Sequence, residues 1–98
     1  MATTAYQDCT ATVAVTVPAI TDPDIASVDV DISTGLTEMV AAVGDAVIAI
    51  PLEAMETNCR IVSAYVIAAD SVRVVFGSLG GNVTGSAKNF KFLVTDLT

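Results

Sequence analysis

Histidine and tryptophan are both absent from this 98-residue sequence, and only four residues are lysine or arginine. The lack of histidine removes the commonest general base and transition-metal ligand. Eleven acidic residues against the four basic ones give a net charge of −7, so the chain carries no basic footprint for nucleic acid. We therefore expect a non-enzymatic protein that has no cofactor, no bound metal and no nucleic-acid partner.

Long hydrophobic runs are also absent. The longest apolar stretch, Ala46 to Leu52, is far below the roughly 18 residues that a membrane-spanning helix needs. Residues 1–8 have neither a cationic segment nor an apolar one, so we expect no signal peptide and no membrane partner. The apolar content of 53% argues against disorder, and the length corresponds to one domain.

Only two cysteines are present, and they are fifty positions apart, at Cys9 and Cys59. This spacing excludes a CxxC redox or zinc motif. A disulfide between them would contribute about 4 kcal/mol by closing a long loop. Without a signal peptide the compartment is expected to be reducing, so we favour free, buried thiols over a disulfide.

The pattern that is present has a period of two, which is typical of half-buried strands. Strands are predicted over residues 10–17, 25–32, 46–52, 60–68, 71–76 and 90–95, separated by turns rich in Gly, Asp and Pro. Residues 36–43 fit either a short helix or a bent strand. The sequence therefore predicts an all-β fold: a small antiparallel β-sandwich or jelly-roll-like barrel of six to eight short strands, with or without one short helix. We expect an N-terminal arm over residues 1–9 and a single β domain over residues 10–98.

Within these strands, alternation indicates which side chains share a face. Asp29 and Asp31 are predicted to point outward from the strand that buries Val28, Val30 and Ile32. We interpret the two carboxylates as a solvated face that blocks edge pairing. Calcium binding is the alternative, but the sequence has no calcium loop that ends in a bidentate Glu.

Two predicted strands, 46–52 and 61–68, are apolar on both faces, and no helices are predicted that could cover the second face. One interpretation is that single exposed apolar residues are simply tolerated. We favour the other, an interface for a homo-oligomer or a docked partner, and low lysine and glutamate content fits it. The candidate interface residues are Ala46, Ile48, Ile50, Val62, Ala64, Val66 and Tyr6.

Four passages resemble a known class of proteins. They are Val43-Gly-Asp-Ala-Val-Ile-Ala-Ile-Pro51, residues 62–76 with an Asp70-Ser71 turn, Asn82-Val-Thr-Gly85, and Phe90-Lys-Phe-Leu-Val94. Their order is similar to that in small β-domains of tailed bacteriophages, the capsid cement or decoration proteins. The resemblance covers about the last half of the chain, and it assigns no binding residue.

The resemblance implies a structural virion protein on the capsid exterior, made in the host cytoplasm, that binds and stabilises the major capsid protein. It also implies self-association, as a homotrimer or a dimer. Residues 1–8 are a candidate arm for adding a strand to a partner sheet. Two alternatives remain open: a phage tail-tube or head-completion protein, and a free-standing Ig-like binding module.

Overall fold

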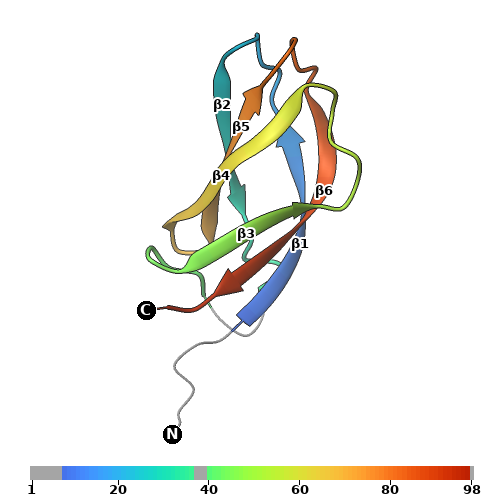
Figure 1. Cartoon of the computed structure of the whole chain (residues 1–98). Helices are drawn as coiled ribbons and strands as arrows, with labels where there is room; N and C mark the ends of the chain where they lie inside the picture. Colours follow the sequence, from blue (N-terminus) through green and yellow to red (C-terminus); the bar gives the residue numbers. More distant parts are fainter. Residues whose placement is uncertain (1–7, 37–39, 98) are drawn as a thin grey trace, which may run out of the picture.

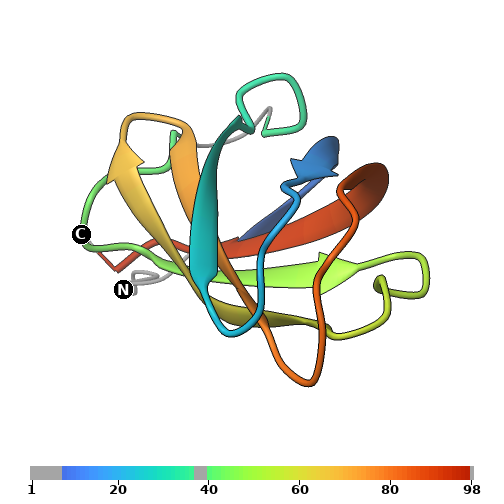
Figure 2. The ribbon, with the colours of Figure 1, turned by 90° about the horizontal axis from the view of Figure 1, so that it is seen from above.

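The chain folds into six antiparallel strands in a computed structural model, which describes residues 8–36 and 40–97. The strands are β1 (Asp8–Val17), β2 (Ile25–Asp31), β3 (Ala46–Pro51), β4 (Cys59–Ala68), β5 (Ser71–Ser78) and β6 (Ser86–Thr95). They make two three-stranded sheets with the orders β1-β6-β3 and β2-β5-β4 (Figure 1). Figure 2 shows the two sheets facing one another as layers. The predicted all-β antiparallel sandwich is confirmed, and the described residues contain no helix.

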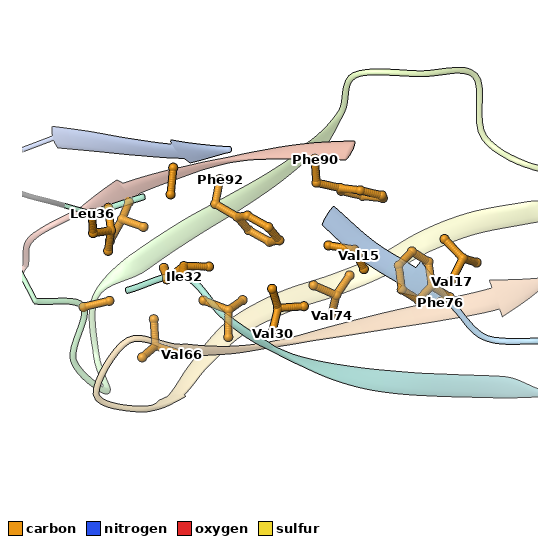
Figure 3. Close-up of a cluster of buried hydrophobic side chains, with 14 of the residues drawn as sticks. Val15, Val17, Val30, Ile32, Leu36, Val66, Val74, Phe76, Phe90 and Phe92 are labelled. Carbon is orange, nitrogen blue, oxygen red and sulfur yellow. The ribbon is translucent and has the colours of Figure 1, made fainter. Parts of the chain in front are cut away.

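The core lies between the sheets and is centred on their middle strands, β5 and β6. Phe76 of β5 meets Phe90 of β6 edge to face, with ring centroids 6.1 Å apart, and Phe92 stacks beside Phe90 at 6.2 Å (Figure 3). Aromatic rings favour such geometries and bury large apolar areas. The predicted alternation is confirmed, because residues at every second position are fully or largely buried: Val15, Val17, Val30, Ile32, Val72, Val74, Phe76, Phe90, Phe92 and Val94.

The sequence predicts that Val62, Ala64 and Val66 of β4 lie together in an outer interface, but the structure separates Val62 from the other two. Ile61 pairs with Phe76 and Ser63 pairs with Val75, so Val62 is an extra residue in a β-bulge. A bulge inserts one unpaired residue and so reverses which later side chains face the core. Val62 therefore points outward and is 50% exposed, whereas Val66 is only 5% exposed and points into the core (Figure 3).

The connections are fixed by specific turn residues. Gly44 has φ of 104°, a conformation that residues with a Cβ seldom adopt, and it leads into Asp45 and β3. Of the segment 36–43, residues 36 and 40–43 are irregular loop, and residues 37–39 lie outside the described residues.

The start of β1 also differs from the predicted division of the chain. Strand β1 begins at Asp8, and both Asp8 and Cys9 pair with β6, opposite Thr95 and Val94. Residues 8 and 9 therefore belong to the sheet, because the register with β6 continues to the end of that strand. Residues 1–7 lie outside the described residues.

Candidate apolar docking surface

Strand β3 presents an apolar stripe on the outer face of its sheet. Its burial alternates, so that Val47 and Ala49 pack against the core while Ala46, Ile48 and Ile50 face outward. Ile48 is 56% exposed and Ile50 is 39% exposed. Leu93 of β6 stands directly opposite Ile48 in the register and is half-buried. We call Ala46, Ile48, Ile50 and Leu93 the β3 patch.

The residues that flank the β3 patch across β6 are polar or charged, and the row of Ala46 contains Thr95 and Asp8. Across β6, Thr10 lies in register with Leu93, and Thr12 lies in register with Lys91, which in turn stands opposite Ile50. Partners in register lie on one face, about 4.5–5.5 Å apart. An apolar centre with a polar border is the usual composition of a protein-binding surface.

The structure divides the predicted interface residues between two sheets and the core. Ala46, Ile48 and Ile50 are outside, as predicted, whereas Val62 is exposed on the other sheet. Ala64 is partly buried against the core, and Val66 belongs to the core, so neither can form an outer surface. Val62 is separated from Ala64 and Val66 because the bulge at Val62 shifts the alternation of β4 by one residue. Tyr6 lies outside the described residues.

Leu93 was not predicted as an interface residue, although its sequence position contained the signal. It alternates with Phe92 and Val94, which are both fully buried, so it had to face outward. What the sequence did not show is that β3 pairs with β6 and places Ile48 beside Leu93.

The outer face of the β2-β5-β4 sheet is organised around a cross-strand ion pair. Nε of Arg73 on β5 donates to Oδ1 of Asp29 on β2 at 2.8 Å, and the second guanidinium nitrogen reaches Oδ2 at 3.2 Å. The hydrogen bond from Arg73 lowers the pKa of the Asp29 carboxyl. Hydrogen bonds with Asp29 and with Tyr65 raise the pKa of Arg73. Asp29 does face solvent as predicted, and it does so as the partner of Arg73.

A second apolar cluster covers Gly77 on the same face. A Cβ at Gly77 would lie 3.1 Å from Val62, 3.3 Å from Nε of Arg60 and 3.6 Å from Ile25. Side chains from both flanking strands thus meet over the central strand, and glycine leaves them room. Ile25 is 65% exposed, so this cluster is a smaller apolar surface with an arginine at its border.

The residues that could carry chemistry do not gather in one place. Cys9 and Cys59 are free, as predicted, and pack partly buried against the core. Burial raises the pKa of the Cys59 thiol, and the nearby Glu56 adds to the shift. Within residues 8–36 and 40–97, no group of three or more Cys, Asp or Glu side chains could hold a metal ion. No helix in this part of the chain is long and apolar enough to cross a membrane.

The turn motifs that carry the phage resemblance have structural roles in this chain. The carboxylate of Asp45 accepts hydrogen bonds from the Ala42 and Leu97 N–H groups, at 2.9 and 3.1 Å. Asp70, with φ of 55°, binds the N–H of Ala41 through its side chain. The amide oxygen of Asn82 accepts from the Asp22 N–H. These residues fasten loops and are not part of the β3 patch.

Comparison with family models, with curated proteins and with solved structures found no match to this chain.

Proposed function

We propose that the chain is a non-enzymatic structural protein of a phage virion, a capsid cement protein that binds the major capsid protein on the outside of the shell. The observation that supports docking is the β3 patch. Its apolar side chains stand on a regular sheet whose opposite face is anchored by Phe90, Phe92 and Val94, each fully buried. A surface held in this way loses little conformational entropy on binding.

The capsid as partner rests on the resemblance of residues 43–94 to cement proteins. The charge pattern around Ile48 and Ile50 is compatible with it, because Lys91 is the only charged residue in the two rows that hold Leu93, Ile48 and Ile50; in the third row, that of Ala46, Asp8 lies at the far end. The chain as a whole carries −7, so a surface with few acids is the one that can approach another protein without repulsion. Self-association as a trimer or a dimer belongs to the same proposal.

The test is co-sedimentation of the purified chain with capsids of the phage that encodes it, stripped of this protein. We expect the wild-type chain to pellet with the capsids and Ile48→Asp to raise the Kd at least about tenfold, because the interface would bury an unpaired carboxylate. Ser27→Asp is the matched control, since Ser27 is exposed on the outer face of the other sheet and should leave binding unchanged. Equal capsid binding by Ile48→Asp and the wild type would exclude the β3 patch as the capsid-binding surface.

The native mass separates the alternatives. A ring with sixfold symmetry that joins the tail and leaves the shell bare would identify a tail-tube component and refute the cement assignment. A monomer that ignores capsids and tails alike would identify a free-standing binding module.

A further inference from the structure

The four outer strands of the two sheets differ in how their open edges are protected. Strand β2 carries Asp29 and Asp31, β3 is six residues long and ends in Pro51, and β4 contains two register shifts. Charges, proline, short length and bulges are the devices that prevent an edge strand from pairing with another chain. Strand β1 has ten residues in unbroken register with β6 and shows none of these devices between Cys9 and Val17.

The register also shows which backbone groups of β1 face its open edge. Asn89 of β6 accepts a hydrogen bond from the Leu52 N–H at 2.9 Å and donates its own N–H to Glu53 at 2.7 Å, so its backbone groups point toward the β3 side. Backbone direction alternates along an antiparallel strand. The backbone N–H and C=O groups of Phe90 and Lys88 therefore point toward β1, where these residues pair with Val13 and Val15.

It follows that the N–H and C=O groups of Thr12, Ala14 and Thr16 point away from β6. Part of this edge is covered, because Gly35 packs on it: a Cβ there would lie 2.6 Å from the Ala11 Cβ and 3.3 Å from the Thr12 nitrogen. At the other end Pro18 follows the strand and has no N–H to donate. The uncovered part of the edge is therefore centred on Val15 and offers the backbone groups of Ala14 and Thr16.

We propose that this edge pairs with the same edge of a second copy of the chain, antiparallel, with Val15 opposite Val15. Ala14 of each copy then faces Thr16 of the other, and their N–H and C=O groups exchange hydrogen bonds. The pairing joins the two β1-β6-β3 sheets into one continuous sheet across a twofold axis. A twofold contact is self-complementary, so one unprotected edge is sufficient.

Self-complementarity favours a second copy as the occupant, and the charge pattern of β1 allows it. Two chains that each carry −7 repel one another wherever acids meet, but residues 9–17 contain no charged side chain. Like charges directly opposite across strands destabilise pairing, and this register places none there. The inference specifies the self-association within the proposed function as a dimer, and it does not depend on what the β3 patch binds.

The test measures mass and amide exchange of the isolated chain, without capsids, from about 10 µM to about 1 mM. Sedimentation should show a monomer–dimer equilibrium. Across this range the amides of Ala14 and Thr16 should become protected from hydrogen exchange, whereas those of Val13, Val15 and Val17, which already bond to β6, should not change. This alternation is specific to pairing at the open edge.

Ala14→Lys should raise the dimer Kd at least about tenfold, since it places a charge at the paired edge. Ala68→Lys is the matched control: it is also an exposed alanine on an edge strand, but on β4 of the other sheet, outside the β3 patch. Circular dichroism verifies that both variants fold. A monomer throughout, a trimer, unprotected Ala14 and Thr16 amides, or dissociation by Ala68→Lys and not by Ala14→Lys would each overturn the proposal. Capsid binding is scored separately, so the two proposals can fail independently.

Discussion

Replacing Gly35 with alanine should destabilise the protein by about 1–3 kcal/mol, the usual cost of forcing an extra methyl group into a packed site. The new Cβ would lie 2.6 Å from the Cβ of Ala11 and 2.9 Å from its Cα. Ala11 cannot yield, because it is 2% exposed in the middle of the β1–β6 pairing, opposite Phe92. The loop is fixed as well, since Ile32 and Leu36 on either side of Gly35 are core residues.

A double-mutant cycle with Ala11→Gly isolates the contact. Ala11→Gly alone should cost about 1–2 kcal/mol, through a lost buried methyl group and a more flexible unfolded chain. In the double mutant the contact at 2.6 Å is gone, and those with the Cα at 2.9 Å and the Thr12 nitrogen at 3.3 Å remain. The combined loss should therefore be smaller than the sum of the single losses by at least about 1 kcal/mol.

The measurement is urea unfolding at 25 °C followed by circular dichroism, since the chain has no tryptophan to report by fluorescence. The midpoint should fall while the m-value stays constant. If Gly35→Ala remains within about 0.5 kcal/mol of the wild type, the loop is free to move away from β1, and the reasoning fails. Strictly additive losses would show that the cost does not come from contact with the Ala11 Cβ.

Two further predictions concern carboxylates. Asp45→Asn should lower the free energy of unfolding by about 1–2 kcal/mol in the same assay. Asp45 is 8% exposed, and an amide can accept from only one of the two N–H groups that its carboxylate holds. The control Asp22→Asn, at an exposed residue, should have little effect. The lowered pKa of Asp29 means that its contribution to stability is present above the unfolded value near 3.8 and is lost as the pH falls through the lower folded value. In an NMR titration, Arg73→Met should raise the titration midpoint of Asp29 toward 3.8. The midpoint of Asp31 should stay low, because hydrogen bonds from Ser33, and not Arg73, lower the pKa of Asp31. A rise at both residues, or at neither, would contradict the assignment of Arg73 as the cause of the lowered Asp29 pKa.

Local pattern was sufficient to predict the strands and most of their faces. Alternating Val13, Val15 and Val17 had to bury one side of β1, and the same holds for Phe90, Phe92 and Val94 of β6, because side chains along a pleated strand alternate by geometry alone. The outward position of Ile48 and Ile50 followed from the same rule. It failed at Val62, where one extra residue in β4 reversed the alternation, and nothing in the local sequence marks that bulge.

By itself, then, the sequence determined that the protein is all-β, which residues alternate, and that it has more apolar residues than one sandwich core buries. Only the tertiary structure decided which strands are neighbours. Pairing β3 with β6 placed Leu93 beside Ile48, and pairing β2 with β5 brought Arg73 to Asp29, 44 residues away. It also left β1 at an edge. Side-chain alternation is a property of each strand, whereas neighbours and edges depend on contacts between distant segments, which no local pattern encodes.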